Sequence, residues 1–287
     1  MNDHPLLKVA IPNKGSLSEA AHTVLREAGY RVRTDSKELV LVDADNHVEF
    51  YYLRPRDIAV YVGGGTLDLG ITGRDMLIDS GADATVIMEL GFGRSRFRFA
   101  APKGDGYELA DLNGKRIATS YPGLLSTYLA EHGVAARLVH LDGAVESSVR
   151  LGVADAIADV VETGTTLRQA GLEVFGDTIL DSEAVLIRRN DSEVDPGLVE
   201  HLQRRISGVL VARDYVLLDY DIAEPDLDAA CKLTPGLQGP TISPLAREGW
   251  VAVRALVPAK GTQTLMDQLW VLGARGLLVT EVSACRL

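Results

Sequence analysis

Short runs of Val, Ile and Leu alternate with helical patterns along the chain, and this alternation limits the folds open to it. Near the start, LLKVAIP predicts a buried strand, residues 13–16 a turn, and the apolar spacing of residues 17–28 a helix. Gly29 supplies a stop for that helix. Strands separated by helices usually pair in parallel, so we predict an α/β protein with largely parallel sheets.

The alternation falls into three groups along the 287 residues, a length that allows about two or more domains. We predict a first lobe from residues 1–95 together with 189–214, and a second lobe from residues 96–188. Residues 215–287 have the β-α-β-β-α-β order of a ferredoxin-like module. Modules of this kind commonly serve regulation or assembly, which is an analogy from fold alone.

Composition excludes several classes of protein. The balance of 40 acidic against 29 basic residues gives a net charge of −11, which disfavours binding to nucleic acid or anionic membranes. Cys231 and Cys285 lie far apart and form no C-x-x-C motif, so we expect neither disulfides nor zinc, as in a cytoplasmic protein. No apolar stretch reaches about 18 residues, so we expect no secretion signal and no transmembrane helix.

The segment 141–171 is richest in residues that carry chemistry. An apolar strand that contains Asp159 runs into a polar turn made of Glu162, Thr163, Gly164, Thr165 and Thr166. Backbone N–H groups and hydroxyls of such a turn form a cradle for a phosphate, and an acid beside it can hold ribose hydroxyls or a metal-bound pyrophosphate. By itself such a turn is more often only a well-capped helix start.

Other motifs and charges narrow the choice. No Walker A motif is present and no glycine cluster completes G-x-G-x-x-G, so the sequence does not support a kinase or a dinucleotide-binding enzyme. Lys14 lies at a strand-to-helix turn, where it is either an anion ligand or a solvated loop lysine. Arg94, Arg96 and Arg98 alternate on one strand face, as in a solvated face or a triphosphate clamp.

One set of positions within 146–167 has the spacing of a known signature. The set consists of Glu146, Gly152, Ala154, Ile157, Asp159, Val160, Thr163, Gly164, Thr166 and Leu167. In these residues the chain resembles the ATP phosphoribosyltransferases. The likeness extends through VAIPNKGSLSEAA, LRPRDI, LDLGITGRD, DLNGKRIATSYP, LDGAVE and PTISPLA, so it covers nearly the whole chain. The C-terminal module makes the chain similar to the long form of the family, which is catalytic by itself.

The resemblance implies a fold and a reaction. It implies two periplasmic-binding-protein-like lobes around a cleft, followed by the ferredoxin-like regulatory domain. The enzyme would transfer the phosphoribosyl group of phosphoribosyl pyrophosphate to N1 of ATP, release pyrophosphate and so begin histidine biosynthesis, with histidine as feedback inhibitor. Mg²⁺ is the natural counter-ion of pyrophosphate. A homo-oligomer, either dimer or hexamer, is also implied, and the sequence leaves open both its size and the carboxylates that contact magnesium.

The resemblance also implies roles for individual residues. Catalytic roles fall to Asp159, Glu146 and Lys14. Phosphoribosyl pyrophosphate would be bound by Glu146, Asp159, Glu162, Thr163, Gly164, Thr165 and Thr166, and ATP by Lys14, Arg54, Asp75 and Tyr121. The Asp75 carboxylate can accept a hydrogen bond from the exocyclic amine of adenine, and the Tyr121 ring can pack on the base. Histidine would bind at Asp221, Thr241 and Leu256.

Two other functions remain open at this point. A non-catalytic binding protein or ligand sensor can be built from the same two lobes, although the chain has no helix-turn-helix before them. A second alternative is a phosphoribosyltransferase with a different nucleophile. Incubation with phosphoribosyl pyrophosphate and a panel of bases or nucleotides distinguishes the three by the release of pyrophosphate.

Overall fold

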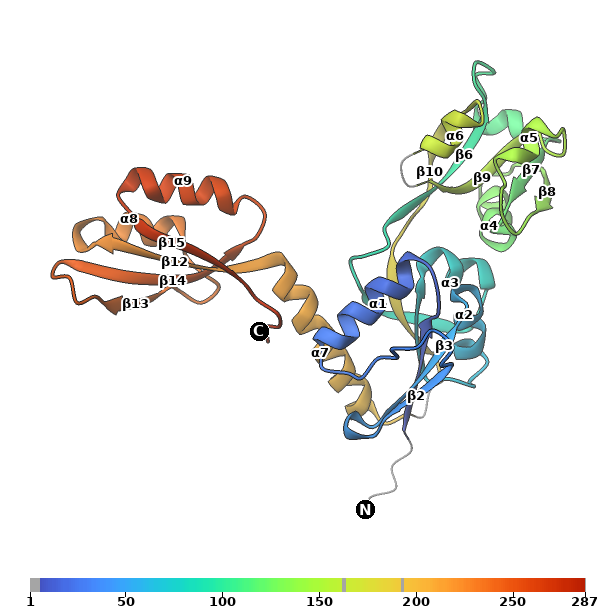
Figure 1. Cartoon of the computed structure of the whole chain (residues 1–287). Coiled ribbons are helices and arrows are strands. Elements are labelled where there is room, and N and C mark those ends of the chain that lie inside the picture. Colours follow the sequence, from blue (N-terminus) through green and yellow to red (C-terminus); the bar gives the residue numbers. More distant parts are fainter. Residues whose placement is uncertain (1–5, 162–163, 192–193, 287) are drawn as a thin grey trace. The chain divides into compact units, whose positions relative to one another are not determined.

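The computed structural model describes residues 6–161, 164–191 and 194–286 of the chain (Figure 1). Contacts between residues divide the chain into two compact units. The first unit contains residues 1–23 and 31–199, and the second contains residues 24–30 and 200–287. The first unit is built around two separate sheets and the second around one.

The first sheet has six strands in the order β2-β3-β1-β4-β11-β5. Its strands are β1 (Leu7–Pro12), β2 (Val40–Asp43), β3 (Val48–Leu53), β4 (Leu69–Gly73), β5 (Ala84–Glu89) and β11 (Ala184–Arg189). The helices of this lobe are α1 (Ser16–Glu27), α2 (Pro55–Gly63) and α3 (Arg74–Ser80). Ile58 and Val62 of α2 are fully buried and form one core cluster with Val185 of β11. Burial of such apolar side chains holds the helix on the sheet.

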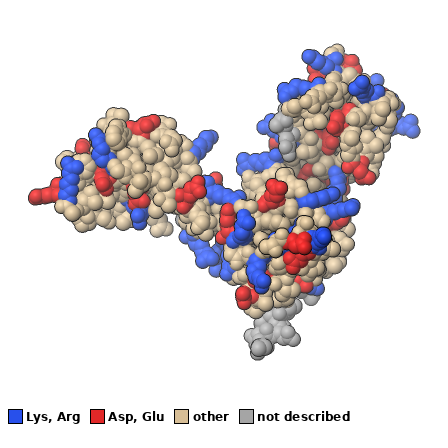
Figure 2. All heavy atoms as spheres, in the orientation of Figure 1, with Lys and Arg blue, Asp and Glu red and all other residues tan. Residues whose placement is uncertain are grey.

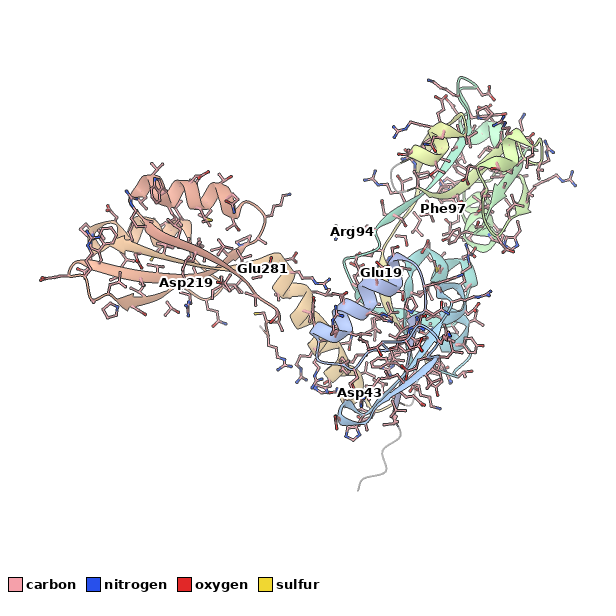
Figure 3. All side chains as sticks on the ribbon, viewed as in Figure 1. Glu19, Asp43, Arg94, Phe97, Asp219 and Glu281 are labelled. Atoms are coloured by element: carbon pink, nitrogen blue, oxygen red, sulfur yellow. The ribbon has the colours of Figure 1, made fainter. Side chains whose placement is uncertain are left out.

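The second sheet has five strands in the order β10-β6-β9-β7-β8. Its strands are β6 (Ser95–Pro102), β7 (Arg116–Thr119), β8 (Arg137–His140), β9 (Ala156–Val161) and β10 (Leu172–Ser182), and its helices are α4 (Pro122–Glu131), α5 (Ser147–Arg150) and α6 (Thr165–Gln169). Side chains alternate across β6. Phe97, labelled in Figure 3, and Phe99 enter the core shared with α4, whereas Ala100 enters a second core that includes Leu167 of α6. Both faces of this sheet are therefore packed.

The prediction of largely parallel sheets was wrong in part. Strand β1 pairs in parallel with β3 and β4, and β7 pairs in parallel with β8 and β9. Strands β2, β5, β6, β10 and β11 pair antiparallel. The chain enters the second sheet at β6, and it returns from β10 of that sheet to β11 of the first sheet. The antiparallel strands are thus those by which the chain passes between the sheets, together with β2 and β5 at the edges of the first sheet. Because β11 already belongs to the first sheet, the return begins at Ala184 rather than at residue 189.

The second unit contains the predicted ferredoxin-like module. After α7 (Pro196–Asp214) come β12 (Tyr215–Ala223), α8 (Leu227–Leu233), β13 (Thr241–Pro244), β14 (Trp250–Pro258), α9 (Thr262–Leu272) and β15 (Arg275–Glu281). The antiparallel sheet has the order β13-β14-β12-β15. Leu218 and Tyr220 of β12 pack with Ala230 of α8 and Leu269 of α9 in one core. The helices thus cover one face of the sheet, and the predicted order is confirmed. Three short 3-10 helices complete the described elements, at Ala44–Asn46, Leu109–Leu112 and Glu224–Asp226.

Helix α7 contacts residues at the end of α1. Arg213 forms an ion pair of 2.8 Å with Glu27, and the Arg205 guanidinium lies 5.1 Å from the centre of the Tyr30 ring. These contacts place residues 24–30 in the second unit together with most of α7. We predict residues 189–214 to belong to the first lobe, and the contacts divide that stretch near residue 199.

Two expectations from composition concern membranes and disulfides. In the part of the chain that the structure describes, no helix is long and apolar enough to cross a membrane. Cys231 and Cys285 are both unpaired and partly buried thiols.

An ion pair joins β7 to the turn before β9. The Arg116 guanidinium donates to both carboxylate oxygens of Asp155 and to the Gly152 carbonyl, and the Arg116 backbone N–H also donates to Asp155 at 2.8 Å. These hydrogen bonds lower the pKa of Asp155 to about 2. The charged carboxylate thus ties two parallel strands together at their entry.

We predict that Asp155→Asn lowers the midpoint of thermal unfolding by about 2–4 °C at neutral pH. A depressed pKa means that the stabilisation is complete above the unfolded value of 3.8 and is lost as the pH falls toward about 2. Circular dichroism melts should therefore converge for parent and variant in that range. Asp105→Asn, an exposed change in the same lobe, is the control, and a pH-independent difference for Asp155→Asn would contradict the assignment.

Candidate active site

The ends of the parallel strands carry most of the predicted site residues. Lys14 follows β1, Arg54 follows β3, Asp75 follows β4, Tyr121 follows β7, Glu146 follows β8 and Asp159 lies near the end of β9. Parallel strands end at the same edge of a sheet, where α/β proteins bind their ligands. Each lobe therefore contributes one row of polar residues.

Asp75 opens α3 and is 5% exposed. Its Oδ1 atom accepts a hydrogen bond of 3.0 Å from the Ser182 hydroxyl, and the same hydroxyl oxygen accepts the Asp75 backbone N–H at 3.1 Å. Ser182 is the last residue of β10, so two segments 107 positions apart fix this carboxylate. The Tyr121 hydroxyl also hydrogen-bonds the Asp75 carboxylate, which can accept further hydrogen bonds from a ligand.

Tyr121 precedes α4 and is also buried. Its ring meets Phe97 edge to face, with ring centroids 5.3 Å apart. Burial raises the pKa of the Tyr121 hydroxyl well above its usual value, and the negative charge of Asp75 raises it further. The ring therefore stays a neutral, fixed surface at physiological pH.

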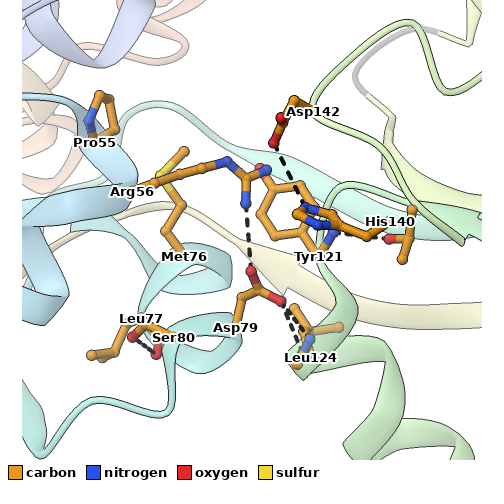
Figure 4. A network of polar contacts seen from close by, with 12 residues as sticks. Pro55, Arg56, Met76, Leu77, Asp79, Ser80, Tyr121, Leu124, His140 and Asp142 are labelled. Atoms are coloured by element: carbon orange, nitrogen blue, oxygen red, sulfur yellow. Dashed lines mark hydrogen bonds and ion pairs between the residues drawn. The ribbon is translucent and has the colours of Figure 1, made fainter. Parts of the chain in front are cut away.

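The Tyr121 ring is also contacted from the first lobe (Figure 4). The Arg56 guanidinium lies 4.2 Å from the ring centroid, in a cation–π contact, and forms an ion pair of 3.4 Å with Asp79. The other Asp79 oxygen accepts the backbone N–H groups of Gly123 at 2.8 Å and Leu124 at 3.1 Å. An acid of α3 thus caps the first turn of α4, which belongs to the other sheet. No room exists for a side chain at Gly123, where a Cβ would lie 2.2 Å from the Asp79 carbonyl oxygen.

Asp159 has the most perturbed carboxyl group of this region. Partial burial, together with the negative charges of Glu146 and Asp75, raises its pKa to about 6. The positive charge of Arg56 and a hydrogen bond of 2.8 Å from the Val160 backbone N–H act in the opposite direction. Glu146 and Asp75 are therefore each close enough to repel the Asp159 carboxylate, and Arg56 is close enough to attract it. Perturbed groups of this kind gather at functional sites.

The polar turn after β9 is described in part. Gly164 has a φ of +69°, which favours glycine, and it caps α6. Thr165 and Thr166 open that helix and are exposed, while Leu167 anchors it in the core. Glu162 and Thr163, which the sequence assigns to the same phosphate site, lie outside the described residues.

Lys14 and Arg54 are exposed at the edge of the first sheet. Lys14 lies in the turn before α1, next to Gly15 with a φ of +81°. Arg54 has an extended backbone directly before Pro55 of α2. Among the described residues, neither side chain forms a hydrogen bond or ion pair in the structure. Their positions agree with the prediction, and their roles stay predictions.

The three residues assigned to histidine lie on one face of the second unit's sheet. Asp221 of β12 pairs with Ala252, Thr241 of β13 pairs with Arg254, and Leu256 of β14 pairs with Leu217. Asp221 and Leu256 alternate with residues of the core, and Thr241 is paired with Arg254, which also does, so all three share the face opposite α8 and α9. Figure 3 labels Asp219, which is two residues before Asp221 on β12 and therefore on this same face.

Sequence reasoning assigned no role to three residues of the first unit's network, Arg56, Asp79 and Ser182. Arg56 belongs to the LRPRDI motif, so its motif was a usable signal. Asp79 and Ser182 carry no such signal, because only the packing of α3 on α4 and the pairing of β10 bring them to the site.

The donor set can be compared with the needs of a magnesium ion. Within the described residues, no group of three or more His, Cys, Asp or Glu side chains is arranged to hold a metal. Asp159 and Glu146 supply two nearby carboxylates whose repulsion a cation would relieve. This pair fits an ion such as Mg²⁺, which takes one or two protein carboxylates and completes its shell with phosphate oxygens and water.

Comparison with known proteins gives matches along nearly the whole chain. The family model described as ATP phosphoribosyltransferase matches residues 54–208, and the model described as the C-terminal domain of the same family matches residues 212–284. A protein of Pseudarthrobacter chlorophenolicus named ATP phosphoribosyltransferase is 62% identical over 284 residues, which cover 98% of this chain and 100% of that protein. A protein of Streptomyces coelicolor with the same name is 59% identical over 285 residues, with the same coverage.

A solved structure agrees with the sequence matches. It is the ATP phosphoribosyl transferase (HisG:HisZ) complex from Thermotoga maritima, in which the matched chain is 30% identical to this one with a TM-score of 0.60. The match covers 70% of this chain and 99% of that chain.

We predict that Asp159→Asn stabilises the protein at neutral pH. A carboxyl whose pKa is raised on folding does not lower the free energy of unfolding below pH 3.8, because it is protonated in both states. Above about pH 6 its destabilising effect is complete. The shift of about 2 units corresponds to at most on the order of 3 kcal/mol. Urea unfolding followed by circular dichroism should favour the variant at about pH 8 and converge with the parent below about pH 4.

The control is Asp105→Asn, which changes the charge of the same lobe by the same amount. If Asp159→Asn were no more stable than the parent at about pH 8, burial and the neighbouring charges would not destabilise the ionised Asp159 carboxylate.

Proposed function

The chain belongs to the family of ATP phosphoribosyltransferases, the enzymes of the first step of histidine biosynthesis, and we propose that it joins the phosphoribosyl group to N1 of ATP. Family membership makes it a transferase and sets aside a passive binding protein. The observation that supports the proposed chemistry best is the gathering of Asp75, Tyr121, Glu146 and Asp159 at the strand ends of two sheets.

We propose that Asp75 and Tyr121 bind the adenine of ATP. The Asp75 carboxylate can accept the exocyclic amine, while the Tyr121 ring can pack on the base. Arg56 now covers that ring, so a base on the same face would displace the guanidinium. The ion pair with Asp79 gives Arg56 a partner in that event. Lys14 and Arg54, both exposed at the same sheet edge, are then available to the triphosphate.

We propose that the end of β9 and the turn after it bind phosphoribosyl pyrophosphate. Gly164, Thr165 and Thr166 would hold the 5-phosphate through backbone N–H groups and hydroxyls. Asp159 and Glu146 would meet the ribose hydroxyls or a magnesium ion on the pyrophosphate. Such an ion neutralises the charge of the leaving group.

The reaction asks for little covalent chemistry from the protein. The lone pair of adenine N1 forms the new bond to the anomeric carbon, and the electrons of the broken carbon–oxygen bond leave with pyrophosphate. The two rows of residues would align N1 with that carbon, and the three acids favour the positive charge that develops on the ribose. Positioning and electrostatics therefore supply the acceleration.

We propose that histidine inhibits the enzyme through the second unit. Asp221, Thr241 and Leu256 share the open face of its sheet, where an acid can bind the ammonium group and a hydroxyl the polar groups of the amino acid. Gly276 of β15 leaves room beside Asp221, because a Cβ there would lie 3.3 Å from the carboxylate. Inhibition at a distance requires histidine to favour a less productive arrangement of the site.

Two further proposals concern the assembly of the protein and its compartment. We propose a homo-oligomer, dimer or hexamer, from the family resemblance alone, since the HisG:HisZ complex of the Thermotoga maritima relative joins two kinds of chain. Two unpaired cysteines agree with a reducing cytoplasm.

We predict that Asp159→Asn lowers the turnover number at saturating substrates by about 100-fold or more, the scale of a lost electrostatic contact in an active site. In the parent, kcat/KM for phosphoribosyl pyrophosphate should fall as the pH drops through about 6, because protonation removes the Asp159 charge. The assay follows release of pyrophosphate from ATP and phosphoribosyl pyrophosphate.

Two results of this assay would contradict the proposal. A variant as active as the parent would remove Asp159 from the site. Pyrophosphate release with another base or nucleotide, and none with ATP, would assign the enzyme a different nucleophile.

We predict that Lys14→Ala raises the KM for ATP several-fold at low ionic strength and less at high ionic strength, as expected for a screened charge contact. Steady-state kinetics at two salt concentrations measure this. Lys232→Ala, which removes an exposed lysine of α8 in the second unit, is the matched control. Equal values for Lys14→Ala and the parent at low salt would make Lys14 a solvated loop residue.

We predict that histidine inhibits the parent and that Asp221→Ala weakens its binding at least tenfold, since the ammonium group loses its charged acceptor. Calorimetry of histidine with the full chain gives the affinity, and the pyrophosphate assay gives the inhibition. Asp228→Ala, on the exposed side of α8, is the control. Unchanged affinity in Asp221→Ala would move the effector site away from this sheet.

A further inference from the structure

Basic side chains gather on the face of the five-stranded sheet that carries α6. The structure contains a cavity of about 560 Å³ between α6, the end of β9, strand β6 and the start of β10. Its lining includes Arg96, Arg98, Lys103, Arg168 and Glu173. The volume is that of a site for a small molecule.

The cavity and the proposed adenine site are separated by β6. Phe97 points from this strand to Tyr121, whereas Arg96 and Arg98 alternate with it and point to the opposite face. Ala100, next in the same alternation, packs in the core with Leu167 of α6. A base on the Tyr121 ring is therefore on the far side of the sheet from this cavity.

The charge of the cavity is opposite to that of the chain. Four basic side chains line it, while the chain carries a net charge of −11 and its visible face mixes both signs (Figure 2). The acid in the lining, Glu173, accepts the Gly104 backbone N–H at 2.9 Å. Arg96 forms an exposed ion pair of 3.4 Å with a second acid, Asp181. Arg98 and Lys103 form no ion pair with another described residue, so their positive charges favour an anion.

Arg98 is the best-placed ligand of that anion. Its Nη2 atom donates to the Gly176 carbonyl at 2.7 Å, which holds the side chain in place. Its Nε atom is buried and has no hydrogen-bond partner among the described residues. Buried donors are nearly always satisfied, so an orphan N–H in the wall of a basic cavity indicates a missing acceptor. A phosphate oxygen supplies one and forms a charge-assisted bond.

The spacing of the cations indicates an extended anion. Arg96 and Arg98 are about 7 Å apart along the strand, and Lys103 follows further along the same edge. Arg168 approaches from α6 on the other wall. A single phosphate cannot meet a row of charges of this length, but a chain of phosphates can.

We propose that this cavity binds the phosphoanhydride chain of a polyphosphate or of a nucleotide, as a site separate from the adenine pocket. The proposal does not depend on the reaction proposed above. Because Val161 and Gly164 also line the cavity, the pyrophosphate of phosphoribosyl pyrophosphate is one source of such a chain and a free polyphosphate is another.

The test is calorimetry of inorganic tripolyphosphate with the full chain at low salt. We expect Arg98→Gln and Lys103→Gln each to weaken binding at least tenfold, Arg98→Lys to retain part of it, and the parent to lose affinity as salt rises. Lys103 is exposed, so its variant remains informative if Arg98→Gln fails to fold. Arg137→Gln, an exposed change on β8, is the matched control.

A competition experiment identifies which molecule supplies the bound phosphates. Displacement of tripolyphosphate by phosphoribosyl pyrophosphate assigns the cavity to the substrate's own phosphates, and simultaneous binding assigns it to a separate ligand. Two results overturn the proposal: tripolyphosphate fails to bind the parent, or binding is lost in Lys14→Ala and kept in both cavity variants. Neither result bears on whether the parent forms phosphoribosyl-ATP, so the two proposals fail separately.

Discussion

The ends of the parallel strands are the constraint on which the site depends. A strand that ends inside the fold leaves its last residues beside those of its parallel neighbours, because hydrogen bonding aligns the strands. In the first sheet this constraint brings Asp75 to the edge, and in the second it brings Tyr121, Glu146 and Asp159. Loops alone would not hold four side chains in register, so the sheets provide the precision that positional catalysis requires.

The ionised form of Asp159 is unfavourable in this arrangement. Burial raises the pKa of Asp159, and the negative charges of Glu146 and Asp75 raise it further. Arg56 offsets part of this rise while also contacting Tyr121. A metal ion that arrives with the substrate, or the positive charge that develops on the ribose, would reduce the repulsion at Asp159. Stability lost at Asp159 is therefore consistent with a carboxylate kept for function.

The contact between α3 and α4 couples the two sheets of the first unit. Asp79 replaces a capping residue that α4 lacks in its own sequence, since Tyr121 at the cap position makes no side-chain cap bond. The close approach of Gly123 to the Asp79 carbonyl leaves no space for a side chain. Through Arg56 the same acid is connected to the proposed adenine surface, so the position of one sheet's helix affects the other sheet's site.

The sequence by itself determined the local order of the chain and supplied candidate site residues, whose roles stay predictions. Hydrophobic periodicity and turn residues are local properties, so the strand–helix order, the ferredoxin-like module and the turn around Gly164 followed from them. Tertiary structure decided which strands pair antiparallel, that β11 returns at Ala184, and that Asp79 and Ser182 join the network. It also decided that Arg98 faces a cavity rather than solvent alone. These features depend on pairing between segments far apart in the chain, and no local spacing encodes the partner.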